Sequence, residues 1–159
     1  MKVLGKISEL VAYITEILAA LILGSVAIVV FIQVMLRLVF NTGISWSDQF
    51  ARFSVIWAVM LIANVLIRDN ELIKVDFLDA LWSKRFIKIR DALYQVILLF
   101  ILLLLITKGL ENAVDGIKST IPGLKISWFW AYLSVPVGAC LMLYQYFCAL
   151  LLNFSKGEQ

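Results

Sequence analysis

Residues 44–76 read ISWSDQFARFSVIWAVMLIANVLIRDNELIKVD, and this stretch decides the fold. It begins with aromatic, acidic and basic residues, continues into an apolar run and ends in a charged loop. Only 15 uncharged residues separate Arg52 from Arg68. In a helix they extend for about 22 Å, less than a hydrocarbon core of about 30 Å. Either this run is no membrane span, or its charged first turns lie at or inside the membrane edge and require a partner.

The composition of the whole chain favours the membrane alternative. The 159 residues are 63% hydrophobic, whereas soluble domains contain roughly 45–50% apolar residues. The net charge is only +3, and the lysines and arginines lie at the ends of apolar segments, which suits membrane anchoring better than nucleic-acid binding. We therefore interpret the chain as an all-α integral membrane protein with no nucleic-acid partner.

The chain contains no histidine. This excludes bis-histidine haem, most transition-metal sites and nucleophiles of the Ser-His or Cys-His type. The two cysteines, Cys140 and Cys148, lie eight residues apart in one apolar stretch, and about 12 Å of helical rise is too long for a disulfide. We expect no catalytic residue, no metal and no cofactor, and hence no enzyme.

Four apolar stretches indicate a single membrane domain of four helices over residues 1–159. The expected spans are about 10–38, 46–67, 88–110 and 127–152. Ser45 and Asp48 have the spacing of a capping box, which predicts the start of the second helix. Between the second and third spans, apolar residues of segment 75–83 recur at helical spacing. This pattern favours a short amphipathic helix on the membrane surface and, equally, a solvated linker helix.

The distribution of basic residues predicts the orientation. Four spans place both termini on one side, and nine of the 14 lysines and arginines fall on that side. Cytoplasmic segments carry the excess of basic residues, so both termini are expected in the cytoplasm. Aromatic and basic residues at the span ends are the expected contacts with the membrane interface: Trp82, Lys84, Arg85, Lys88, Arg90, Trp128 and Trp130.

Small residues form a stripe along the fourth span. Ser127, Ala131, Ser134 and Gly138 are spaced by four, three and four residues, which places them on one helix face. Small side chains allow another helix backbone to approach closely. The stripe therefore predicts either packing inside the four-helix bundle or an interface with another subunit. Pro136 is expected to bend this helix and to free a backbone carbonyl.

The charged start of the second span is a candidate docking segment. Asp48 and Arg52 are four residues apart and can pair along the helix. Charges at this depth favour docking to a second protein, although an ordinary ion pair in the headgroups is the alternative. Asn64 could bond Gln95 or a partner. The predicted interface residues are Arg37, Trp46, Asp48, Arg52, Asn64, Ser127, Ala131, Ser134 and Gly138.

No predicted span carries a lone carboxylate near its middle. A self-sufficient proton-coupled exporter needs a titratable group at the midplane, so this absence weighs against one. Two classes of function nevertheless stay open at this point. The chain could be a small exporter that works as a homo-oligomer, or it could be a membrane anchor subunit of a respiratory enzyme.

Several short motifs recur along the chain in a characteristic order: Arg37, Phe40 and Asn41 in the first turn, Ser45-Trp46, Arg52, Arg68, the segment 73–77 (IKVDF), Ile126, Trp128 and 136–138 (PVG). With these motifs the chain resembles a known family, the small DctQ-type ("Q") membrane subunit of tripartite ATP-independent periplasmic (TRAP) transporters. The chain departs from the family pattern at three places. Gln49 stands where a carboxylate is usual, Leu72 where a histidine is frequent, and Ile62-Ala63 near a common glycine. These departures put fine contacts in doubt and leave the resemblance of the whole chain intact.

The resemblance implies a role in transport and a location. A small subunit of this family associates as a heterodimer with a large multi-span permease subunit, which carries the substrate and sodium sites. A periplasmic binding protein delivers an organic acid, often a C4-dicarboxylate or sialic acid. The small subunit would be part of the fixed scaffold in the bacterial inner membrane, with lipids around it.

Overall fold

The computed structural model describes residues 2–69 and 84–156. Its helices are α1 (Lys2–Phe40), α2 (Ser47–Arg68), α3 (Lys84–Asp115), the 3-10 helix η2 (Gly116–Lys118), α4 (Trp128–Tyr132) and α5 (Ser134–Lys156). An isolated antiparallel bridge joins Thr120 to Ser127, and the described residues contain no β-strand. The expected all-α class is confirmed. The predicted interfacial helix over 75–83, with Trp82, lies outside the described residues.

Four helical stretches are long and apolar enough to cross a membrane. They are Gly5–Phe40, Ser47–Arg68, Ala92–Lys118 and Trp128–Leu151. Helix α2 has 22 residues, so its length is about 33 Å, which matches a hydrocarbon core of about 30 Å. It reaches this length because the turns that carry Asp48 and Arg52 are helical. The length of α2 thus favours the second alternative for this stretch, in which charged turns lie at the membrane edge.

The predicted capping box at the start of α2 is wrong. The residue before the helix is Trp46, and its side chain makes no capping hydrogen bond. The Ser47 hydroxyl donates instead to the carbonyl oxygen of Ile44 at 2.7 Å, and this contact closes the turn. Asp48 accepts a hydrogen bond from Gln33 of α1, at 3.2 Å. Ser47 therefore finds its partner within the turn, whereas Asp48 finds its partner through the packing of α1 against α2.

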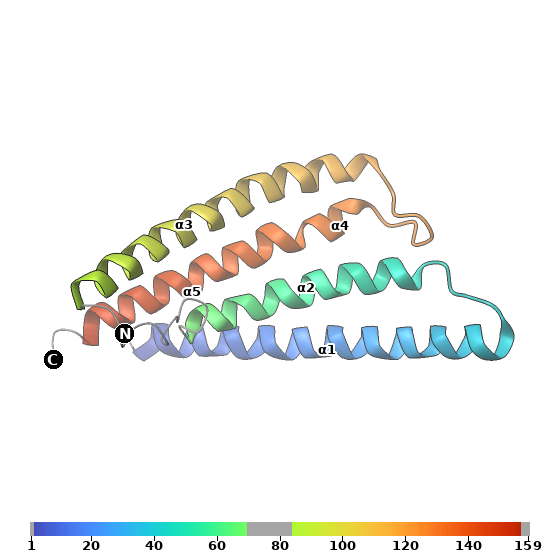
Figure 1. Ribbon diagram of the computed structural model, residues 1–159, viewed down its shortest axis with the longest axis horizontal. Helices are drawn as coiled ribbons and strands as arrows, with labels where there is room; N and C mark the ends of the chain where they lie inside the picture. The colour runs from blue at the N-terminus through green and yellow to red at the C-terminus, as the bar shows by residue number, and fades with distance from the viewer. Residues whose placement is uncertain (1, 70–83, 157–159) are drawn as a thin grey trace.

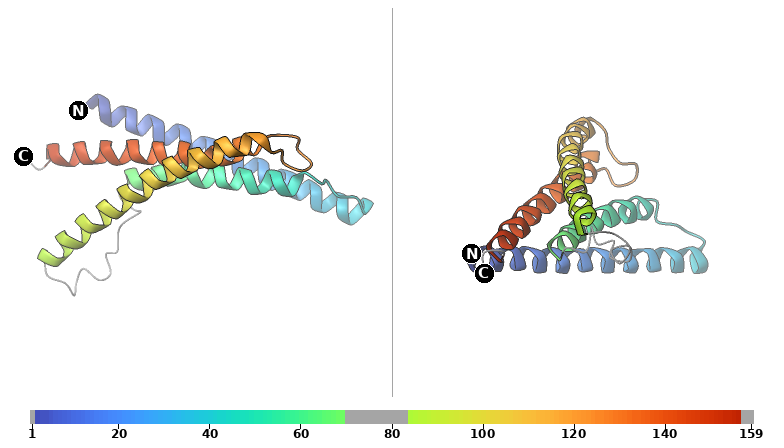
Figure 2. Two further views of the ribbon diagram at one scale, coloured as in Figure 1. Left: turned by 90° about the horizontal axis from the view of Figure 1, so that it is seen from above. Right: turned by 60° about the vertical axis from the view of Figure 1, so that its left-hand side comes forward.

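The helices lie side by side in the order α1, α2, α5, α3 (Figure 1). Helix α2 packs between α1 and α5, and α5 packs between α2 and α3. Figure 2 shows that α3 diverges from α2 toward its own first residues. Both termini lie at the same end of the molecule. Large parts of α1 and α3 are consequently left with exposed apolar side chains.

Close helix contacts depend on two glycines. A Cβ atom added at Gly138 of α5 would lie 2.6 Å from the Cβ atom of Met60 on α2, closer than real Cβ contacts. A Cβ atom added at Gly109 of α3 would lie 2.9 Å from Cδ of Pro136. Around Gly138, the side chains of Ile67, Leu102 and Met142 form one buried cluster. Glycine thus permits the approach of backbones that association in lipid requires.

The fourth apolar stretch is interrupted as Pro136 predicts. Helix α4 ends at Tyr132 and α5 begins at Ser134, with Leu133 between them. Because proline has no backbone N–H, Pro136 donates no hydrogen bond to the carbonyl of Tyr132. The next amide, that of Val137, resumes the helical pattern by donating to the carbonyl of Leu133 at 3.2 Å.

Candidate subunit interface and the contacts that position it

The ends of α1 and α2 on the side away from the termini carry the predicted docking residues. Arg37, Trp46, Asp48 and Arg52 are all exposed. The predicted pairing of Asp48 with Arg52 is not formed. Asp48 is bonded to Gln33 instead, and Arg52 makes no ion pair or hydrogen bond with any described residue. The guanidinium group of Arg52 is therefore available to a group outside the described residues, such as a lipid phosphate or an acid of another protein.

Aromatic contacts hold this end of α2 in place. The rings of Phe53 and Trp128 pack edge to face with centroids 5.1 Å apart, and Trp128 stacks on Tyr132 at 5.6 Å. The indole N–H of Trp57 donates to the carbonyl oxygen of Trp130 at 3.1 Å. The contacts of Phe53 and Trp57 with α4 both follow Arg52 in the chain, within the next two turns of α2, so they hold the segment directly after Arg52 against α4.

The first residue of the small stripe, Ser127, has a local role. Its hydroxyl accepts a hydrogen bond from the amide of Phe129 at 3.2 Å, so it caps α4. It also donates to the carbonyl of Gly116 at 2.8 Å. The loop before it turns back on itself through Gly123 and Lys125, which have positive φ angles of 89° and 52°. Ser127 therefore joins the end of α3 to the start of α4.

The rest of the stripe packs inside this chain. Ala131, Ser134 and Gly138 are buried, and the Ser134 hydroxyl donates to the carbonyl of Ala131 at 2.7 Å. Gly138 faces Met60 of α2. Of the two alternatives for the stripe, packing within the bundle is the one that this arrangement supports.

Asn64 is also an interior residue. Its side chain is 0% exposed, and its amide donates to the Thr15 hydroxyl of α1 at 3.1 Å and to the carbonyl of Leu61. Its Oδ1 atom has no hydrogen-bond partner among the described residues. Gln95, the partner suggested by the sequence, lies exposed on α3. Asn64 therefore links α2 to α1 within this chain.

One polar pair was missed by the sequence reasoning. The Ser8 hydroxyl of α1 donates to Oε1 of Gln145 on α5 at 2.5 Å, and Nε2 of Gln145 donates to the carbonyl of Ser8 at 3.0 Å. Both side chains are buried. The sequence does indicate a buried contact at Gln145, because this residue lies on the same helix face as the stripe of small residues. Polar side chains within spans commonly form hydrogen bonds with neighbouring helices.

The interior offers hydrogen bonds and no charge. The buried polar side chains of the described residues are Ser8, Thr15, Ser47, Asn64, Ser134 and Gln145. In the same part of the chain, no group of three or more His, Cys, Asp or Glu residues could hold a metal ion. The buried polar side chains of the described residues are thus hydroxyls and amides, and no Asp, Glu, Lys or Arg of that part of the chain is buried.

The predicted membrane-interface residues lie at both ends of the helices. Lys84, Arg85, Lys88 and Arg90 occupy the first turns of α3. At the opposite end, Trp128 is half-buried against Phe53, whereas Trp130 is 60% exposed. An exposed tryptophan at a span end suits the headgroup region.

Comparison with known proteins gives one family and two relatives. The family model "Tripartite ATP-independent periplasmic transporters, DctQ component" matches residues 26–156. The sialic acid TRAP transporter permease protein SiaT of Haemophilus influenzae (strain 86-028NP) is 28% identical over 127 residues, which cover 79% of this chain and 20% of that protein. A protein of Haemophilus influenzae (strain ATCC 51907 / DSM 11121 / KW20 / Rd), provisionally named a TRAP transporter small permease protein, is 38% identical over 63 residues. These cover 40% of this chain and 39% of that relative. The chain thus spans about a fifth of the first relative and two fifths of the second.

Proposed function

This chain belongs to the DctQ component family of tripartite ATP-independent periplasmic (TRAP) transporters, and from this premise we propose that it is the small permease subunit of a sodium-coupled organic-acid importer. The cargo is an acid of the sialic acid or C4-dicarboxylate type. A large multi-span subunit holds the substrate and sodium sites, and a periplasmic binding protein delivers the substrate. The subunit described here is a fixed scaffold and catalyses no reaction.

The uncharged interior carries this proposal. Binding an acid together with sodium requires charged or strongly polar groups near the midplane, and the buried polar side chains of the described residues are neutral and mostly bonded to one another. The sialic acid TRAP permease relative gives further support. The matched region covers only 20% of that protein, so the same relative has ample length for a separate transport domain.

The proposed contact with the large subunit lies where α1 and α2 present exposed polar groups. Arg37, Trp46, Asp48 and Arg52 are accessible there, and Arg52 has no partner among the described residues. Exposed apolar side chains of α1, such as Leu38 and Phe40, adjoin this cluster. An interface that combines an apolar surface with an unpaired arginine fits a protein partner better than lipid tails.

An uptake assay in liposomes distinguishes a scaffold subunit from a chain that transports by itself. Purified and reconstituted alone in liposomes, this chain is expected to show no sodium-dependent uptake of labelled sialic acid or C4-dicarboxylates, because none of its described residues places a charged side chain in the interior. Reconstituted with the proposed large subunit and binding protein, it is expected to take part in uptake well above background. Uptake by this chain alone, at a rate similar to the complete system, would contradict the scaffold proposal and favour a small exporter.

The proposed topology places the domain in the inner membrane with four spans and both termini in the cytoplasm. Reporter fusions after Ser155 and Asp69 are expected to give cytoplasmic signals, and fusions at Thr42 and Pro122 periplasmic ones. The physical reason is the excess of lysine and arginine on the side of the termini. A periplasmic signal from the Asp69 fusion, with an intact protein on a blot, would refute the four-span topology.

A further inference from the structure

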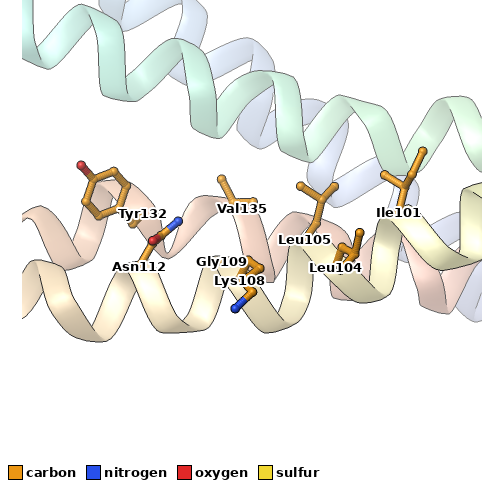
Figure 3. Close-up of a pocket in the computed structure, with 8 residues that line it drawn as sticks. All are labelled: Ile101, Leu104, Leu105, Lys108, Gly109, Asn112, Tyr132 and Val135. Atoms are coloured by element: carbon orange, nitrogen blue, oxygen red, sulfur yellow. The ribbon is translucent and has the colours of Figure 1, made fainter.

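An apolar groove of about 350 Å³ runs between α3 and the α4–α5 segment (Figure 3). Ile101, Leu104 and Leu105 line it from α3, and Val135 lines it from α5. Further along α3, toward η2, the lining becomes polar at Lys108 and Asn112. The lining of the groove is therefore apolar along most of its length and polar at one end, which matches the two parts of an amphiphilic molecule.

A polar recess continues the groove at this end. It also has a volume of about 350 Å³, and it is lined by Asn112, Asp115, Gly116, Ser119 and Tyr132. Asn112 and Tyr132 line both hollows, so the two are contiguous. The recess lies where α3 passes into η2, which is the end of the molecule away from the termini.

The polar groups around the recess have unused hydrogen-bonding capacity. Lys108 donates to Glu111 at 2.7 Å, and an ammonium group has two further N–H donors. The carboxylate of Asp115 and the side chains of Asn112 and Tyr132 form no ion pair or hydrogen bond with the described residues. The ammonium of Lys108 and the carboxylate of Asp115 therefore lie beside neutral hydrogen-bonding side chains.

We propose that this groove is a binding site for a membrane phospholipid whose zwitterionic headgroup ends in a primary ammonium. One acyl chain lies along Ile101, Leu104 and Leu105, the phosphate binds Lys108, and the ammonium donates to Asp115 with Ser119 beside it. Lys108 and Asp115 are seven residues apart, so they lie on nearly the same face of α3 with about 10 Å of helical rise between them, and the long lysine side chain can shorten the distance that the headgroup has to span. A single headgroup carries its phosphate and its ammonium close enough together to bridge such a separation.

Charge decides between a lipid and a helix of another protein as the occupant. A partner helix in this groove would have to cover Lys108 and Glu111, whose side chains are 67% and 62% exposed, and burial of charges within a membrane protein is costly. A phospholipid leaves both charges in the headgroup region, brings its phosphate to the remaining N–H donors of Lys108 and brings its ammonium to the carboxylate of Asp115. The side chain of Lys108 is also long enough to reach that region from a position inside the span.

Native mass spectrometry of the purified full-length chain tests the site. The chain is exchanged into detergent with equal amounts of phosphatidylethanolamine, phosphatidylcholine and phosphatidylglycerol. Phosphatidylethanolamine is expected to be retained about tenfold over phosphatidylcholine, whose quaternary ammonium has no N–H to donate to Asp115. Asp115→Asn should reduce this preference to below about twofold, because a charge-assisted hydrogen bond is lost. Asp115 is exposed, so this variant is expected to fold normally.

A matched pair of variants tests the apolar part. Leu104→Trp fills the groove and should lower the retention of all three lipids, whereas Leu103→Trp on the neighbouring exposed position should leave retention unchanged. Equal retention of the three lipids, or equal effects of the two tryptophans, would overturn the proposal. Displacement of the lipid when the large subunit is present would also overturn it, since the groove would then be a protein contact.

Discussion

The variant Gly138→Leu is expected to lose its folded structure in detergent at temperatures at which the wild-type chain is stable. A Cβ atom at this position would lie 2.6 Å from Cβ of Met60 and 3.1 Å from its carbonyl oxygen. The clash involves the backbone of α2, so no rotation of a side chain relieves it. Overpacking of a core costs about 1–3 kcal/mol and sometimes more. We expect about 3 kcal/mol here, roughly a hundredfold in the ratio of folded to unfolded chains.

Thermal unfolding followed by size-exclusion chromatography measures this effect, and Gly24→Leu is the control. Gly24 lies in α1 with nothing within 4 Å of an added Cβ atom, and leucine favours a helix more than glycine does. This control should unfold at or above the wild-type temperature. If Gly138→Leu is as stable as Gly24→Leu, α5 does not pack on α2 as described.

The charge reversal Arg52→Glu is expected to prevent co-purification with the proposed large subunit. Arg52 is exposed and has no partner among the described residues, so its proposed partner is an acid or a carbonyl of the other subunit. Truncating one member of an interfacial charge pair can cost about 2–5 kcal/mol, and reversal adds repulsion. We expect recovery of the complex to fall at least about tenfold, with uptake falling in parallel.

Pull-down from membranes at equal expression measures this recovery. Arg52→Lys should be intermediate, because lysine keeps the charge and loses the planar fork of the guanidinium. The same reversal at Lys118, an exposed cation of η2 outside the proposed interface, should have little effect. If Arg52→Glu is recovered with the large subunit and supports uptake at wild-type levels, this segment only anchors the chain in the headgroups. The interface would then lie on the exposed apolar faces of α1 and α3.

Contacts between helices account for the expectations that failed. Ser45 and Asp48 have the spacing of a capping box, yet Ser47 closes the turn and Asp48 bonds Gln33. A sequence shows which groups lie near one another along a helix, and it does not show which neighbouring helix competes for them. The same reason explains Asn64, whose partner is Thr15 of α1.

The sequence by itself determined the class, the four apolar helices and the break at Pro136, because these follow from hydrophobicity, helical periodicity and the missing N–H of proline. The motifs around Arg37, Arg52 and Pro136 also indicated the family that the comparisons then showed. Only the tertiary structure decided the order α1, α2, α5, α3 and the side of the fourth helix that is buried. It also paired Ser8 with Gln145 across 137 residues and left Arg52 without a partner among the residues that the structure describes. Lipid tails and helix faces are equally apolar, so hydrophobicity alone does not specify which faces meet, and close contacts such as Gly138 on Met60 make that choice.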